Sequence, residues 1–287
     1  MFGWGRCHKN LQQQLTIELE RCNGKLGGRL QKRLKQLEVI DLAKLLNGVW
    51  SLLDSGTKEQ LIIMVNEEGL VDKWLLYLQQ GNVEEKVVAA TILGNLQETR
   101  ALGFLLEAIR DRDEGVQLAA TEALIKLRDP RCLKLLITGL NEPKRLPPAR
   151  IADVLLAFGT TSIPPLLHFL EESPEEVTVR IIEILGLFKD SQTLTALENC
   201  LRTGSDNVRE AAANVLGEME VKEVGEILII ALKDNVPRVR AAAVRALGKL
   251  KHKEAQPALT ACLDDDSQEV RLAAKMALKV LAVKNSF

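Results

Sequence analysis

Hydrophobic residues recur every three or four positions from Leu11 to Leu37, the spacing of one face of an α-helix. Glycines at positions 24, 27 and 28 interrupt this stripe, and each costs up to about 1 kcal/mol of helix stability relative to alanine. One continuous helix and two helices with a kink therefore both remain open. Basic side chains follow a neighbouring row of the same segment: Arg21, Lys25, Arg29, Lys32 and Arg33.

Two functions fit the basic amphipathic segment, residues 1–36. It can be the capping helix of a repeat stack, with the basic row as its solvated outer face. Alternatively, it can bind an anionic membrane or an acidic partner, which is typical of basic amphipathic helices.

The apolar pattern continues as helical pairs through the rest of the chain. Residues 37–66 predict a degenerate first pair, split by a turn at 55–57. From residue 67 to 287 each unit has a first helix, a short turn rich in Asp, Asn, Gly or Pro, and a second helix. We expect these residues to form one continuous repeat domain.

The second helices repeat one sequence, most clearly at Val236–Leu250, with related segments around Val208 and Val270. Aligning Val208, Val239 and Val270 as anchors gives a period of 31 residues, which extends back through Val177, Arg150, Val116 and Glu85. A fixed period of this size predicts a stacked solenoid. The third unit is longer, with the proline-rich turn at 141–150 as its insertion, either a neutral length change or part of a binding face.

Segments 205–219 and 234–265 resemble bacterial HEAT repeats, of the HEAT-like kind named from phycobilisome lyases. The resemblance extends with decreasing strength towards residue 67. It implies an all-α fold, a right-handed α-solenoid (superhelix) of about seven to eight HEAT-like helical pairs with an N-terminal capping helix. It also implies that the second helices line the concave side, and that the protein acts as a scaffold, assembly factor or chromophore-attachment helper.

An Asp/Arg ladder is expected along the stack in the C-terminal half. The residue after the anchor is Arg in three successive repeats, and Asp stands just before each second helix, where it can accept hydrogen bonds from backbone N–H groups. An Arg one repeat along could bridge to that Asp bidentately. The predicted members are Arg209, Arg240, Arg271, Asp206, Asp234 and Asp266.

Solvent-facing positions of the second helices are predicted at the sixth and tenth residues after each anchor. Of these two rows, the residues chosen as the partner-binding face are Glu122, Lys126, Leu156, Glu183, Leu187, Asn214, Glu218, Arg245 and Lys249. The rows also contain Met276 and Val280. They mix both charges with apolar side chains, which favours a protein or peptide over nucleic acid.

Composition narrows the function further. The chain has 287 residues, 46% hydrophobic and 3% aromatic, and a net charge of −1, so no overall electrostatic footprint for nucleic acid exists. Five cysteines without a CxxC pair favour a reducing compartment. No signal-peptide core and no long apolar run is present, so we expect a cytoplasmic monomer whose membrane contact, if any, is weak.

Catalytic and cofactor motifs are missing from the sequence. Deoxyhypusine hydroxylases, which resemble this fold, carry His-Glu pairs, whereas His8, His168 and His252 here precede Lys, Phe and Lys. There is no glycine-rich nucleotide motif and no assignable Ser/His/Asp set, so we expect no cofactor and no metal. The preferred function is a non-enzymatic interaction scaffold. The alternatives are a peripheral membrane adaptor docked by residues 1–36, and an accessory lyase or oxidoreductase by analogy with the phycobilisome lyases.

Overall fold

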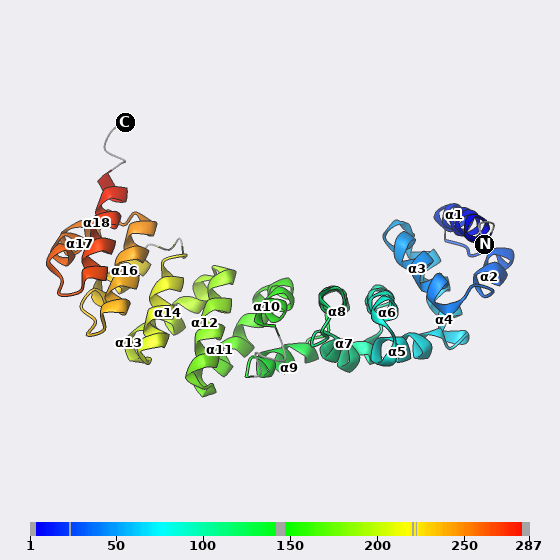
Figure 1. Cartoon of the computed structure of the whole chain (residues 1–287), viewed down its shortest axis with the longest axis horizontal. Helices are drawn as coiled ribbons and strands as arrows, with labels where there is room; N and C mark the ends of the chain where they lie inside the picture. Colours follow the sequence, from blue (N-terminus) through cyan, green and yellow to red (C-terminus); the bar gives the residue numbers. More distant parts are fainter. Residues whose placement is uncertain (1–3, 23, 142–146, 220, 222, 283–287) are drawn as a thin grey trace. The chain divides into compact units, whose positions relative to one another are not determined.

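A computed structural model describes residues 4–22, 24–141, 147–219, 221 and 223–282; for residues 4–10 and 12 only the backbone is described. In these ranges the secondary structure is entirely helical (Figure 1). The helices form two compact units, Met1–Leu136 with Glu142–Ala157, and Ile137–Asn141 with Phe158–Phe287. The chain passes between the units at 136/137, 141/142 and 157/158, inside the range 67–287 that was predicted to be one domain.

The first unit contains α1 to α8 and α10. Their bounds are α1 Trp4–Glu20, α2 Gly28–Leu34, α3 Val39–Val49, α4 Ser55–Glu67, α5 Leu70–Gln80, α6 Val83–Asn95, α7 Leu102–Ala108, α8 Glu114–Leu127 and α10 Pro148–Ala157. Helix α9, Arg131–Gly139, runs across the division. The pairs α5/α6 and α7/α8 are first and second helices, and the second helices α6, α8 and α10 pack one against the next.

The second unit contains four complete helical pairs. Their bounds are α11 Ile163–Glu172 with α12 Glu175–Phe188, α13 Leu194–Thr203 with α14 Asp206–Leu216, α15 Glu223–Ala231 with α16 Pro237–Leu250, and α17 Gln256–Ala261 with α18 Gln268–Ala282. The second helices α12, α14, α16 and α18 again pack in sequence order. The expected all-α solenoid of helical pairs is confirmed.

Close packing of neighbouring second helices depends on the small residue nine places after the anchor. A Cβ on Gly94 would lie 2.6 Å from the Cα of Ala123 in the next second helix, and one on Gly217 would lie 2.6 Å from the Cβ of Ala246. Interiors at this density do not accept an added methyl group without movement of a helix. Gly159 has the same place after its anchor, but it has a positive φ of 64° and follows the end of α10.

The N-terminal stripe forms two helices, α1 and α2, rather than one. Gly24, with a φ of 83°, lies between them, and its N–H donates to Asp54 Oδ2 at 3.1 Å and to Thr57 Oγ1 at 3.2 Å. Asp54 is also the N-cap of α4, where Oδ1 accepts from the N–H of Thr57 at 2.9 Å. Residues 55–57 therefore begin α4, and the predicted turn there is wrong: Asp54 starts the helix before the Ser-Gly-Thr sequence can break it.

Helix α3 lies in the row of second helices. It packs on α6, and Asn47 of α3 donates to the carbonyl of Val88 at 3.1 Å, while α4 packs on the first helix α5. Trp74 of α5 is fully buried and donates its indole N–H to the carbonyl of Val39 at 3.2 Å. The segment 37–66 thus places its first helix where the later repeats place their second.

Candidate interaction surface

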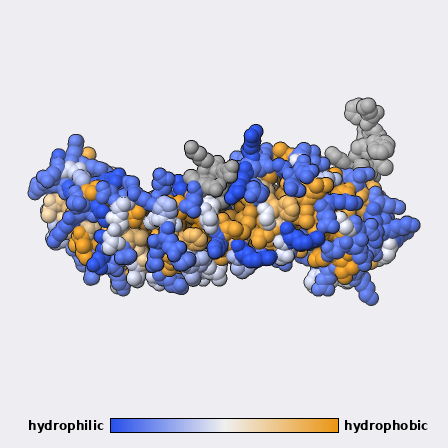
Figure 2. Space-filling view, turned by 90° about the horizontal axis from the view of Figure 1, so that it is seen from below, coloured by the Kyte–Doolittle hydropathy of each residue, from blue (hydrophilic) through white to orange (hydrophobic). Residues whose placement is uncertain are grey.

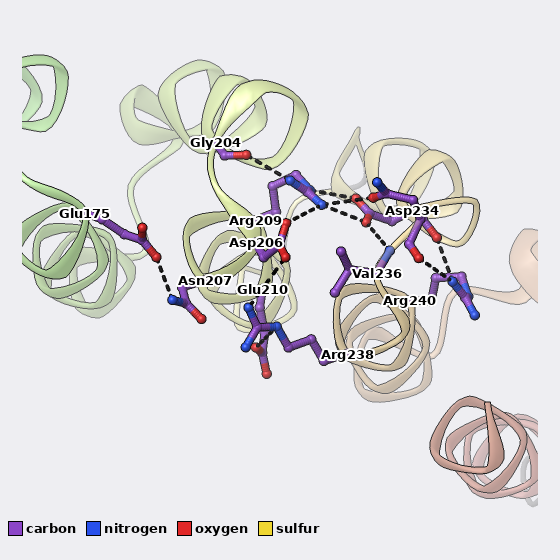
Figure 3. Close-up of polar contacts among 11 residues, drawn as sticks. Glu175, Gly204, Asp206, Asn207, Arg209, Glu210, Asp234, Val236, Arg238 and Arg240 are labelled. Atoms are coloured by element: carbon purple, nitrogen blue, oxygen red, sulfur yellow. Dashed lines mark hydrogen bonds and ion pairs between the residues drawn. The ribbon is translucent and has the colours of Figure 1, made fainter.

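The predicted ladder exists in the second unit, where its first rung joins α14 to the turn before α16. Arg209 donates from Nε to Asp234 Oδ2 at 2.8 Å and from Nη2 to Asp234 Oδ1 at 2.9 Å (Figure 3). Both side chains are more than four-fifths buried. Burial alone would raise the pKa of Asp234, but hydrogen bonds from Arg209 and from the N–H of Val236 outweigh it and lower that pKa.

The second rung uses Asp265 and not the predicted Asp266. Arg240 binds Asp265 through Nε to Oδ2 and Nη2 to Oδ1, both at 2.8 Å. Asp234 and Asp265 each accept from the backbone N–H two residues later, and each lies 25 residues after its arginine, so the two turns have the same conformation. Asp266 is one position out of this register, and its backbone carbonyl accepts from Arg271 at 3.0 Å.

Backbone contacts connect successive rungs. Arg240 also donates from Nη1 to the carbonyl of Asp234 at 2.8 Å, and Arg271 donates to the carbonyl of Asp265 at 2.5 Å. Each arginine therefore fixes the turn before its own helix, and Arg209 and Arg240 also bind the turn of the next repeat. Asp206 has a smaller part: it begins α14 and accepts from Arg209 of the same helix at 3.2 Å.

A rung in the first unit was missed by the sequence analysis. Lys86 Nζ lies 2.7 Å from Asp111 Oδ2, again 25 residues further on, and Asp111 accepts from the N–H of Asp113 at 3.0 Å. Asp113, which stands just before α8, caps that helix by accepting from the N–H of Val116 at 3.2 Å. The 25-residue spacing of Lys86 and Asp111 was the available signal.

Beside the ladder, the predicted binding rows are open to solvent. All nine chosen residues are exposed, from Leu156 at 36% to Leu187 at 55% among the apolar ones. Glu122, Lys126 and Leu156 belong to the first unit and the other six to the second. We call these exposed rows, in each unit separately, the second-helix face.

Polar contacts join residues of this face between repeats. In the first unit Lys126 donates to Asn95 Oδ1 at 2.8 Å, and Asn95 donates to Asn47 Oδ1 at 3.0 Å. In the second unit Lys249 pairs with Glu218, one full period earlier. These pairs hold side chains in line along the stack, although exposed ion pairs add only about 0–1 kcal/mol each.

Two grooves of opposite character open on the second-helix face of the second unit. The groove between α12 and α14 has a volume of about 520 Å³, and its lining includes Glu175, Glu176, Glu183 and Glu210. The groove between α16 and α18 has a volume of about 580 Å³ and is mainly apolar, with Arg245, Lys249 and Lys251 at its border. Arg245 and Lys249 of the second groove belong to the predicted partner-binding face, whereas its apolar wall on α18 was not chosen as part of that face.

A family model for HEAT repeats matches residues 71–156, 163–235 and 204–279, well over half of the chain. The chain is a HEAT-repeat protein. The matched ranges contain the ladder residues and every predicted residue of the second-helix face. No curated protein matches the chain.

Several solved structures are similar to this HEAT-repeat protein at low identity. Human deoxyhypusine hydroxylase is 19% identical, with 96% of this chain and 98% of that chain covered and a TM-score of 0.39. Importin beta is 16% identical, with 96% of this chain and 41% of that chain covered and a TM-score of 0.48. The CpcE–CpcF complex of phycocyanin lyase from Nostoc is 18% identical, with 90% and 96% covered and a TM-score of 0.34.

The cysteines of the described HEAT repeats lack the character of nucleophiles. Cys132, Cys200 and Cys262 are buried, and burial raises the pKa of all three thiols, that of Cys132 to about 12. Thiols with raised pKa values stay protonated and inert. Cys200 and Cys262 occupy the same core position two periods apart.

The basic row of the N-terminal segment is largely open to solvent. Arg21, Lys25, Arg29 and Lys32 are exposed, whereas Arg33 is partly buried and pairs with Glu18 at 2.5 Å. The apolar stripe beside them is buried, as Leu15, Leu19, Leu30 and Leu34 show. Among the helices that the structure describes, none is long and apolar enough to cross a bilayer.

Proposed function

We propose that this HEAT-repeat protein is a non-enzymatic cytoplasmic scaffold that binds a protein partner through its second-helix face. The observation that carries the proposal is the pair of exposed rows, which mix acidic, basic and apolar side chains. The helices that carry these rows are joined between repeats by the Asp/Arg ladder. Partner-binding surfaces of proteins have this mixed composition. A groove for nucleic acid would repeat Lys and Arg instead.

Rigid spacing of the face favours recognition of an ordered partner. Neighbouring second helices approach so closely that glycine is needed at Gly94, Gly186, Gly217 and Gly248. Side chains held in place before binding lose little entropy when the partner arrives.

The first helices, on the opposite side of each pair, expose separate apolar side chains. Figure 2 presents one face of the molecule, on which hydrophobic areas are interrupted by hydrophilic side chains. Exposed apolar residues on first helices include Leu76, Leu135 and Ile230. Single exposed apolar side chains are common on soluble surfaces and indicate no binding by themselves.

The test compares two charge-swapped double variants in affinity capture with quantitative mass spectrometry. Glu183→Arg with Arg245→Glu changes the second-helix face, and the matched control Glu226→Arg with Arg202→Glu changes exposed first-helix positions. We expect a partner that the face variant loses and the control retains. A partner retained by the face variant would contradict the proposal.

A peripheral membrane adaptor is the second candidate, and the exposed basic row of residues 21–32 favours it. Because the leucine stripe of the same segment is buried, such docking would be electrostatic and without insertion. Deleting residues 1–36 should then abolish sedimentation with anionic liposomes. Equal sedimentation of the two proteins would end this hypothesis.

An accessory lyase or oxidoreductase role rests on family resemblance alone. It predicts a bilin-transfer activity that is lost when an exposed acid such as Glu183 is replaced. Absence of transfer to any bilin-binding protein would remove it.

A further inference from the structure

The last helix, α18, carries an unusually exposed apolar stripe. Leu272, Met276 and Val280 are 52%, 71% and 42% exposed. Because they are spaced four residues apart, they lie along one side of the helix. Exposure of three large apolar side chains in line is unfavourable unless another surface covers them.

The stripe forms one wall of the groove between α16 and α18. Gly248 of α16 lies against Ala277 of α18, at a distance where an added Cβ would be 2.8 Å from the alanine Cβ. Gly248, Ala273 and Ala277 therefore form a shallow floor of small residues, and the groove volume is about 580 Å³. From Leu272 to Val280 the wall is about 12 Å long, which matches about two turns of a helix from a binding partner.

Basic side chains border the groove on its α16 side. Arg245 and Lys249 come from α16, and Lys251 follows at its end. On α18, the exposed Lys275 and Lys279 lie beside the stripe, on the side away from α16, by their helical positions. The carboxylates of Glu269 and Glu218 pair with Arg245 and Lys249, and Lys251 leaves the α16 border with a positive charge. Lys275 and Lys279 add positive charge on the outer side of the apolar wall.

Another repeat of the same kind does not fit on this side of α18. In α16, Val244 is fully buried and Gly248 contacts the next helix. Their equivalents one period later are Lys275 and Lys279, so stacking a further helix there would bury two lysines. Burial of unpaired charges is strongly unfavourable.

From the apolar wall and its basic border, we infer that the α16–α18 groove binds an amphipathic helix of a protein partner, with apolar anchors on one face and acidic residues flanking them. The inference rests on the proposed scaffold function and specifies the partner's chemistry. The ligand helix presents anchors at positions i, i+4 and i+7 to Leu272, Met276 and Val280. A flat anionic bilayer matches the charge but not the recessed floor between two helices.

The probe is a labelled helical peptide of about 18 residues with three leucine anchors flanked by Glu, measured by fluorescence polarisation against the full chain. Its matched control has Lys in place of each Glu. We expect the acidic peptide to bind at least about tenfold more tightly than the basic one, and salt to weaken it. Met276→Glu should weaken binding at least about tenfold, whereas Lys233→Glu, an exposed change outside the groove, should not.

Three results would overturn the inference: no binding of the acidic peptide, equal binding of both peptides, or an unchanged affinity in Met276→Glu. A dimer in sedimentation velocity that Met276→Glu dissociates would assign the groove to a second copy instead. Sedimentation with anionic vesicles that this variant loses would assign it to a membrane. If the groove fails while capture still depends on Glu183 and Arg245, the proposed scaffold function stands and only this assignment falls.

Discussion

Removing the Arg240 guanidinium should destabilise the second unit more than removing any exposed arginine of the same helix. Arg240→Ala deletes two charge-assisted hydrogen bonds to Asp265 and one to the carbonyl of Asp234, all at 2.8 Å. The two paired side chains are only 13% and 12% exposed, so Asp265 would be left largely buried without its partner. Hydrogen bonds to charged groups contribute about 1.5–3 kcal/mol, and we expect a loss of about 2–3 kcal/mol.

Thermal unfolding followed by circular dichroism measures this loss, with an expected decrease in Tm of roughly 4–12 °C. Hydrogen exchange should locate the effect in the turn before α18, because repeat stacks unfold locally. The control is Arg245→Ala, whose partner Glu269 is half exposed, and it should cost about 0–1 kcal/mol. Equal Tm values for wild type and Arg240→Ala would refute the ladder as a source of stability.

Three further predictions follow from burial and close packing. Hydrogen bonds from Arg240 lower the pKa of Asp265 in the folded state. The ionised Asp265 therefore contributes its full stabilisation at pH values above the unfolded-state pKa of about 4, and this stabilisation is lost as the pH falls through the lower, folded-state pKa. Asp265→Asn should flatten the dependence of Tm on pH in that range. Gly94→Ala should destabilise the first unit by about 1–3 kcal/mol because its Cβ would meet α8, whereas Gly103→Ala, with open space around it, should be neutral or stabilising; equal Tm changes would contradict the close-packing argument. Cys132, with its pKa raised by burial to about 12, should react with a maleimide at pH 8 only after unfolding. Rapid labelling of Cys132 in the native protein, detected by mass spectrometry, would contradict this prediction.

Much of the architecture is local and could be predicted. Helical periodicity, the 31-residue period and the exposure of Glu183, Leu187 and Arg245 follow from the order of apolar and polar residues within single helices. These features depend on 3.6-residue geometry, which each helix imposes by itself.

Contacts between repeats were harder to predict. The choice of Asp265 over Asp266, and the rung from Lys86 to Asp111, depend on turn conformations 25 residues away from the basic side chain. The turn before α4 was misplaced because Asp54 both caps that helix and binds Gly24, 30 residues earlier. A difference of one residue in a turn redirects the carboxylate, and single-helix patterns carry no information about that direction.

A stack of helical pairs with mixed-charge rows facing solvent follows from the residue pattern alone, because repeated amphipathic helices have few other ways to bury their apolar stripes. Contacts between helices select the carboxylate that completes each rung, and they place α3 in the row of second helices. They also place Leu272, Met276 and Val280 beside Arg245 and Lys249. Those residues come from different helices, and their proximity follows from the spacing and angle at which α16 and α18 pack.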